Sequence, residues 1–263
     1  MNREQATRQW YQDYHGRRGA DRNDLRTNRG VLFQTLALEA SVVAAAYAIE
    51  HDPQTAAVLD VGCGGGGDLY QLVRLKYDPV QITGIDILPD RLAHARRLYP
   101  QARFFLGDAS HMEFASASFD LVFESTMFAT LTDELLSAGI AREMLRVCKP
   151  GGYLMLVDWW TPKPRDPNYR ALTRRRLHDL FQVGSAARLV GEYRGALVPP
   201  VGRFLSKYLP GGYFPVTRLL PFLVGQVAYL LQRTPIPVAG RRDASDGAEN
   251  QLKEECRYAK ACV

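Results

Sequence analysis

The stretch VLDVGCGGGGD, residues 58–68, decides the fold. Its apolar start predicts a strand that is buried on both faces, and the glycines that follow predict a tight turn of bare backbone. In such a turn backbone N–H groups can approach a ligand where any Cβ would collide. Gly62, Gly64 and Gly67 match the G-x-G-x-x-G spacing of dinucleotide sites. The alternative spacing, D-x-G-x-G, uses Gly66 in place of Gly67.

Asp60 separates the two interpretations of this turn. An acid just inside the end of the strand would repel a pyrophosphate, but it suits a ligand with a cationic ammonium group. The Tyr-x-x-x-Lys pair expected of short-chain dehydrogenases is also absent from the sequence. The turn is therefore expected to bind a cationic ligand without phosphate, and S-adenosylmethionine has these properties.

Outward from the turn, strands and helices alternate in the pattern of a mostly parallel sheet. Strands are expected at 56–61, 81–87, 102–106, 118–124 and 153–159. Helices are expected at 3–14, 31–50 and 68–76, from about 89, from about 132 to Pro150, and, with many basic residues, over 163–181. The stretch 186–231 is rich in Pro, Gly and aromatic residues and shows no clear strand pattern.

Composition excludes several classes of protein. Of the 263 residues 46% are hydrophobic and 23% charged, which excludes wholesale disorder, a fibrous repeat and a coiled coil. A net charge of +5 is too small to imply nucleic acid. The four cysteines (Cys63, Cys148, Cys256 and Cys262) show neither Cys-x-x-Cys nor zinc spacing, so no metal is expected. The polar N-terminus lacks a secretory signal, and a cytoplasmic location is expected.

Five motifs in order over 56–159 resemble those of class I S-adenosylmethionine-dependent methyltransferases. VLDVGCGGG resembles the family's first motif, which cradles the methionine half of the cofactor. The others are the acid that ends the second strand, Gly-Asp-Ala after the third, FDLVFES, and RVCKPGGYLML. The resemblance implies a three-layer α/β sandwich with a mostly parallel seven-stranded sheet, a variable C-terminal region, and S-adenosylmethionine as cofactor.

The resemblance also assigns residues to the cofactor. Asp86 matches the acid that accepts both ribose hydroxyls, and Asp108 the acid that accepts the adenine amino group. The residues from Ser110 to Met112 would flank the purine. The implied cofactor-binding set is Asp60, Gly62, Cys63, Gly64, Gly66, Asp86, Ile87, Asp108, Ala109, Met112 and Glu124.

Glu124 and Asp158, near the carboxyl ends of two strands, are the candidate catalytic residues. Either could deprotonate a hydroxyl. Alternatively, each could bond the backbone or an arginine without touching substrate. The alignment places His111 beside the adenine, so it is not expected to act as a base. Thr130 stands where many relatives have a histidine, which weakens any transferred catalytic role.

The acceptor is expected to be a small or lipid-linked molecule, methylated on a hydroxyl oxygen such as that of a surface-glycan sugar. The alternatives are carbon or nitrogen methylation of a quinone-like or amine metabolite, and a catalytically silent protein that binds S-adenosylmethionine. No nucleic acid is expected, because Asp/Asn-Pro-Pro-aromatic does not follow the fourth strand and no Pro-Cys occurs. The basic cluster within 163–176 is interpreted as a solvated helix face.

The chain is divided into an N-terminal helical lid region (1–50), a cofactor-binding core (51–160), a C-terminal part of the same domain that contains the acceptor region (161–239), and a flexible tail (240–263). Trp10, Tyr11 and Tyr14 could form the lid or simply dock on the sheet.

Nineteen mostly apolar residues, 213–231, approach a membrane-spanning length, but Pro, Gly and Arg interrupt them. A substrate-covering subdomain or a homodimer surface is favoured over a peripheral membrane segment. If the segment does touch a membrane, the nearby cations would favour anionic lipid; they are Arg203, Lys207, Arg218 and Arg233.

Overall fold

The computed structural model describes residues 9, 25–163 and 166–235. Its strands are β1 (Val58–Val61), β2 (Ile82–Asp86), β3 (Arg103–Leu106), β4 (Phe119–Ser125), β5 (Cys148–Trp159), β6 (Ala187–Arg194) and β7 (Gln226–Arg233). Its helices are α2 (Arg29–Ala46), α3 (Leu69–Arg74), α4 (Pro89–Leu98), α5 (Glu134–Val147), α6 (Arg174–Phe181), α7 (Pro199–Tyr208) and α8 (Tyr213–Leu219). The short turns η2 (Pro79–Gln81), η3 (Phe128–Thr130), η4 (Pro210–Gly212) and η5 (Pro221–Leu223) are 3-10 helices.

One seven-stranded sheet has the order β3-β2-β1-β4-β5-β7-β6, which confirms the predicted class. The strands β1 to β5 pair in parallel, whereas β7 is antiparallel to both β5 and β6. The carboxyl ends of β1, β2, β4 and β5 therefore lie at one edge of the sheet. Because β7 runs the other way, its first residue Gln226 lies opposite Trp159 at this same edge. Residues 195–225, which contain α7 and α8, join β6 to β7 and enter β7 at this edge. We call this segment the α7–α8 connection.

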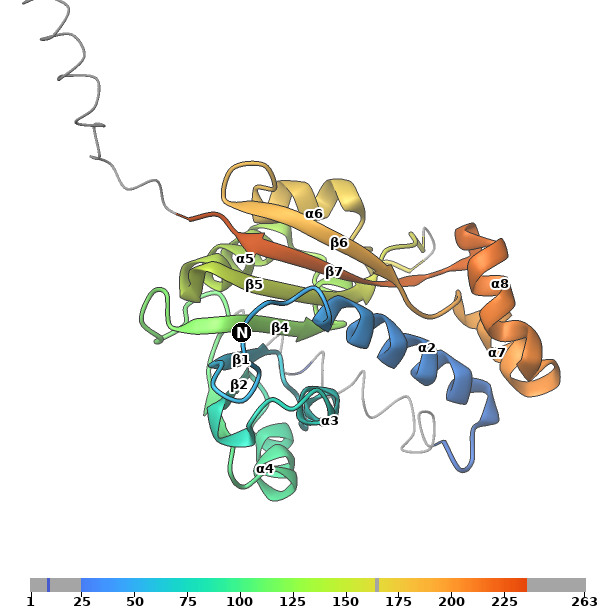
Figure 1. Ribbon diagram of the computed structural model, residues 1–263, viewed down its shortest axis with the longest axis horizontal. Helices are drawn as coiled ribbons and strands as arrows, with labels where there is room; N and C mark the ends of the chain where they lie inside the picture. Colours follow the sequence, from blue (N-terminus) through green and yellow to red (C-terminus); the bar gives the residue numbers. More distant parts are fainter. Residues whose placement is uncertain (1–8, 10–24, 164–165, 236–263) are drawn as a thin grey trace, which may run out of the picture.

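Helices cover both faces of the sheet (Figure 1). Alternation along β1 sends Leu59 and Val61 into the core beneath α5 and α6, while Val58 joins the core beneath α2, α3 and α4. A third, smaller core joins α2 to the α7–α8 connection around Tyr213 and Leu197. The cofactor-type turn after β1 thus stands on strands that are packed from both sides.

The predicted basic helix over 163–181 is wrong in its first half. The helix begins only at Arg174, where the Thr173 hydroxyl caps it by accepting the N–H of Arg176 at 3.2 Å. Prolines at 164 and 167 cannot donate the backbone hydrogen bonds that a helix interior needs. The described residues before Thr173 instead form a loop that returns to the sheet.

The stretch 186–231 contains two strands that the sequence pattern did not reveal. Residues 226–231 of β7 are buried on both faces, so no alternation of polar and apolar residues marks them. The apolar segment 213–231 is therefore not one surface element, because its second half is a core strand. The predicted helix 31–50 is confirmed as α2, whereas helix 3–14, Trp10, Tyr11, Tyr14 and the tail 240–263 lie outside the described residues.

Candidate cofactor and methyl-transfer site

The turn after β1 holds three glycines in left-handed backbone. The φ angles of Gly62, Gly64 and Gly66 are +72°, +51° and +78°, a region that L side chains rarely adopt. Gly67 does not have such a φ, and a Cβ added there would meet nothing within 4 Å. The structure therefore selects the D-x-G-x-G spacing over the dinucleotide spacing.

The same turn is enclosed on two sides. A Cβ on Gly62 would lie 3.1 Å from Sδ of Met127, and one on Gly66 would lie 3.3 Å from the Tyr99 ring. The N–H groups of Gly62 and Cys63 donate to the Ile85 carbonyl at 2.8 and 3.1 Å, which fixes the turn to the end of β2. No signal in the sequence had indicated that Met127 would back the turn.

Two buried carboxylates beside the turn have an oxygen without a partner. Asp60 is 2% exposed and Glu124 is fully buried, and within residues 25–163 and 166–235 neither Oδ2 of Asp60 nor Oε1 of Glu124 has a hydrogen-bond partner. Burial raises the pKa of both groups, and the nearby charge of Asp68 raises the pKa further. Such groups are costly in a folded core unless a ligand satisfies them. Asp60 fits a cationic ligand that brings N–H donors, and the open oxygen of Glu124 can accept a proton from a bound molecule.

Asp68, which ends the glycine run in the sequence, also lies beside this turn. Its side chain is hydrogen-bonded to Ser125 and Gln71, so it joins the end of β4 to the start of α3. Burial raises its pKa as well. The structure thus brings three acids together around one turn, with Asp86 as a fourth whose charge acts on Asp60.

Asp86 ties the glycine turn to the second strand. Its Oδ2 accepts the N–H of Gly64 at 2.9 Å and its Oδ1 accepts the N–H of Leu88 at 2.8 Å. Each carboxylate oxygen has a further lone pair, so two hydroxyls can still be accepted. Burial raises the pKa of Asp86, and the two backbone hydrogen bonds lower it. Ile87, the next residue, is half-buried.

The residues assigned to the adenine lie in the loop after β3. Oδ1 of Asp108 accepts both the N–H and the hydroxyl of Ser110, each at 2.8 Å. Ala109 packs against the core, and the buried Met112 donates its N–H to Glu143 at 2.8 Å. His111 is exposed. The loop is therefore ordered by its own acid, and among the described residues the hydrogen bonds to Asp108 use Oδ1 and not Oδ2.

Cys63 contributes through its backbone. Its thiol is buried, and that burial raises the thiol pKa, so it is not a nucleophile. A Cβ on Gly84 would lie 2.7 Å from the sulfur, which explains the glycine in the middle of β2.

The two candidate catalytic carboxyls differ in their partners. Asp158 bonds the backbone through both oxygens, accepting the N–H of Ala129 at 2.8 Å and of Trp159 at 2.7 Å. Burial raises the pKa of Asp158 to about 7. Glu124 accepts only the N–H of Met127, at 3.1 Å. The backbone-bonding alternative therefore describes Asp158, which holds η3 against β5, while Glu124 keeps an open oxygen.

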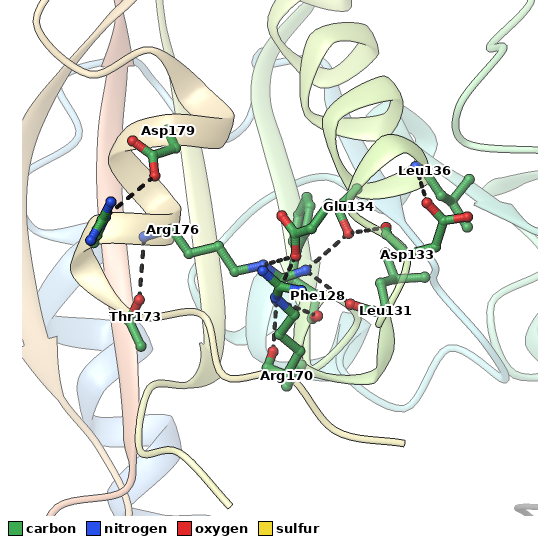
Figure 2. Close-up of polar contacts among 12 residues, drawn as sticks. Phe128, Leu131, Asp133, Glu134, Leu136, Arg170, Thr173, Arg176 and Asp179 are labelled. Carbon is green, nitrogen blue, oxygen red and sulfur yellow. Dashed lines mark hydrogen bonds and ion pairs between the residues drawn. The ribbon is translucent and has the colours of Figure 1, made fainter. Parts of the chain in front are cut away.

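Arg176 anchors the same η3 loop from the other side, as Figure 2 shows. Its side chain is 7% exposed. The guanidinium donates to four acceptors at 2.6 to 2.9 Å: the carbonyls of Phe128, Leu131 and Arg170, and the hydroxyl of Ser137. Glu134 pairs with it at 3.0 Å. Arg176 was expected on a solvated helix face, and that expectation is wrong, because the amphipathic α6 turns this residue inward.

Other cations of the basic cluster have partners within the protein. Arg170 pairs with Glu134 at 2.6 Å, Arg174 pairs with Glu192, and Lys163 lies 4.1 Å from the centre of the Tyr169 ring. Several cations of this cluster are therefore neutralised by partners within the protein. That nucleic acid is not a partner stays a prediction.

Comparison with known proteins agrees with this site. Residues 58–152 match the family model described as a methyltransferase domain. An uncharacterized methyltransferase of Synechocystis is 36% identical over 157 residues, which cover 59% of this chain and 70% of that protein. The 2-methyl-6-phytyl-1,4-hydroquinone methyltransferase of Synechocystis is 38% identical over 110 residues, 41% of this chain and 33% of its own length. The fatty-acid O-methyltransferase of Mycolicibacterium smegmatis is 35% identical over 115 residues, 42% of this chain and 40% of its own.

A crystal structure described as that of a methyltransferase from Bacillus halodurans has the same fold, with a TM-score of 0.54 at 17% identity, over 75% of this chain and all of that chain. The chain belongs to the class I S-adenosylmethionine-dependent methyltransferases. The residues present fit the cofactor: left-handed glycines leave bare backbone in the turn, and the unpartnered oxygen of the buried Asp60 beside it suits a cationic group. The chain spans a third of the hydroquinone methyltransferase and less than half of the fatty-acid enzyme.

Proposed function

We propose that this protein transfers the methyl group of S-adenosylmethionine to a hydroxyl of a small lipid or lipid-linked acceptor. The observation that carries the proposal is Glu124, a fully buried carboxyl at the carboxyl end of β4 with one oxygen unpartnered. It stands beside the acids that fit the cofactor, so one edge of the sheet holds both a cation site and a proton acceptor.

The cofactor supplies an electrophilic methyl group on a sulfonium. Asp60 and the glycine turn hold the cationic methionine half, Asp86 accepts the ribose hydroxyls, and Asp108 accepts the adenine amino group. These residues align the donor, and alignment is the main requirement of an in-line displacement.

Glu124 takes the proton of the acceptor hydroxyl on its open Oε1. With the cofactor bound, the acceptor oxygen would take its methyl group as the carbon–sulfur bond breaks, and a neutral thioether would remain. The proton later passes to water. Because burial raises the pKa of Glu124, its ionised form is a stronger base than an exposed glutamate, and the rate is expected to rise with pH as the group ionises.

The relatives support a lipid acceptor over a glycan sugar, since their names give a phytylated hydroquinone and a fatty acid. The hydroquinone name also supports a second candidate, methylation of a ring carbon in a quinone-like acceptor. Removal of a ring-hydroxyl proton by Glu124 would activate that carbon, so the same residues serve both reactions. The methylated atom separates them.

The test is transfer of labelled methyl from the cofactor into a lipid extract, with the purified chain and Glu124→Gln. Because a positioned base contributes on the order of 10²–10⁴-fold, Glu124→Gln should lower kcat by that factor and leave cofactor affinity within a few-fold. The matched control is Glu50→Gln, which removes an exposed carboxylate from the segment before β1.

An unchanged kcat in Glu124→Gln would exclude it as the base. Label in a glycan fraction alone would favour the sugar acceptor, and no label in any fraction would favour the silent cofactor-binding protein. NMR of a labelled product distinguishes an ether methyl from a ring methyl.

A further inference from the structure

The α7–α8 connection exposes large apolar side chains at the same edge of the sheet as the site. Figure 1 shows α7 and α8 together at one end of the molecule, beyond the ends of β6 and β7. Seven large apolar side chains of this connection are 39% to 77% exposed: Phe204, Tyr208, Leu209, Phe214, Leu219, Leu220 and Phe222. Together with Arg203, Lys207 and Arg218 they make up what we call the α7–α8 face. Within this set the Phe204 and Tyr208 rings lie 5.3 Å apart, and large apolar side chains gathered in one exposed connection are typical of an interaction site.

These exposed side chains are additional to a core that is already complete. Tyr213, Leu197, Val224 and Ala37 are buried beneath them, and the Tyr213 hydroxyl accepts the N–H of Leu197 at 3.2 Å. On α7 the small Gly202 and Ser206 face inward, while Phe204 and Tyr208 face outward. The α7–α8 face is therefore not needed to fold the connection.

The charged side chains within this connection have one sign. No Asp or Glu occurs anywhere from residue 193 to 242, whereas Arg203, Lys207 and Arg218 lie within the connection. Lys207 leans over the Tyr208 ring, with its ammonium 4.9 Å from the ring centre. Cations set beside exposed aromatic and aliphatic side chains complement an anionic lipid surface, where basic groups meet headgroups and apolar groups enter the acyl boundary.

The base of the connection is bonded to the edge that holds the site. The indole N–H of Trp160 donates to the Val224 carbonyl at 2.8 Å, and its backbone N–H donates to Gly225 at 3.0 Å. Trp160 follows the end of β5, two residues after Asp158. A partner surface that binds α7 and α8 would therefore lie beside the carboxyl ends of β4 and β5.

We infer that the α7–α8 face docks the protein on an anionic lipid bilayer. Docking itself goes beyond the proposed function, because it needs neither cofactor nor acceptor. Its consequence for catalysis rests on the proposed function: a lipid acceptor could reach Glu124 from the bilayer without crossing water. Within the apolar segment 213–231, residues 226–231 take no part in docking, since they are buried in β7.

The test is sedimentation of the full chain with vesicles of phosphatidylcholine and phosphatidylglycerol in equal parts, and with vesicles of phosphatidylcholine alone. We expect binding to the mixed vesicles that weakens with added salt. The triple variant Arg203→Gln/Lys207→Gln/Arg218→Gln should bind on the order of 100-fold more weakly, and Phe204→Ser/Phe222→Ser at least tenfold more weakly.

The matched controls are Arg97→Gln/Arg103→Gln/Arg175→Gln and Leu98→Ser/Leu135→Ser, which remove the same kinds of exposed group elsewhere and should bind as the parent does. Calorimetric affinity for S-adenosylmethionine, unchanged in every variant, shows that each is folded. Glu124→Gln should also dock normally, so a failed methyl-transfer proposal leaves this result unaffected.

Equal binding to both kinds of vesicle, or to neither, would overturn the proposal. So would a parent protein that elutes as a dimer and becomes a monomer in Phe204→Ser/Phe222→Ser, because a second copy would then cover the face.

Discussion

The two halves of the sheet depart from stable packing in opposite ways. One half runs from β3 to β4, and the other is built around β7. The first half buries acid oxygens that have no partner, at Asp60 and Glu124. The second half leaves large apolar side chains such as Leu219 and Phe222 exposed. Both arrangements cost stability, and in our proposals each is relieved by a different environment: bound cofactor and acceptor in one half, and a lipid surface in the other. Departures from good packing thus indicate where this protein meets other molecules.

The largest expected effect, on the unfolding free energy, comes from removing the contacts of Arg176 between the two halves. Arg176 reaches from α6 to the loop after β4. Arg176→Met removes the guanidinium donors of the Phe128 and Leu131 carbonyls and leaves Glu134 paired with Arg170 alone. Removal of one partner from a buried charged network costs about 3–5 kcal/mol of unfolding free energy, measured by urea denaturation. The neighbouring Arg175→Met, at an exposed position, should change it by less than about 0.5 kcal/mol. Equal effects would mean that the two halves are not joined through Arg176.

A smaller effect is expected within the first half, at the glycine turn. Gly62→Ala forces an L side chain into a φ of +72° and places its Cβ 3.1 Å from the Met127 sulfur. The left-handed backbone alone costs roughly 1–2 kcal/mol, and calorimetry should show weaker S-adenosylmethionine binding as the turn shifts. Gly67→Ala is the matched control, because its Cβ meets nothing and its backbone is not left-handed. Cofactor binding that is lost equally in both variants would contradict the assignment of Gly66 over Gly67.

The smallest expected effect is a change of the unfolding free energy with pH. An acid whose pKa is raised in the folded state binds more protons there than in the unfolded chain. The unfolding free energy of the cofactor-free protein should therefore fall as pH rises from the ordinary carboxyl pKa through the raised values of Asp60, Glu124 and Asp158, the last about 7. Below the ordinary pKa and above the raised ones, the curve should level off.

Asp60→Asn should make this decline shallower, and saturating S-adenosylmethionine should reduce it in the parent, because the ligand stabilises the ionised acids. Urea denaturation at several pH values provides the measurement. A stability that rises over the same range would show that the acids of the first half have partners in the folded protein.

Much of the first half could be predicted from the sequence. The glycine run and Asp60 define a local backbone requirement, and the alternation of strands and helices appears in short windows. The second half was predicted less well for a physical reason. Strand β7 is covered on both faces, so its residues show no period, and the helix expected from residue 163 was interrupted by prolines.

The sequence by itself determined the class of sheet, the turn that receives the cofactor and the acids around it, since each depends on residues adjacent along the chain. Tertiary structure alone decided which of two buried carboxyls kept a free oxygen, because Ala129 and Trp159 occupy Asp158 while Glu124 bonds only Met127. It also decided that Arg176 is a buried clamp and that the α7–α8 side chains face outward. Hydrogen-bond partners and exposure are set by segments far apart in sequence, and no local pattern encodes them.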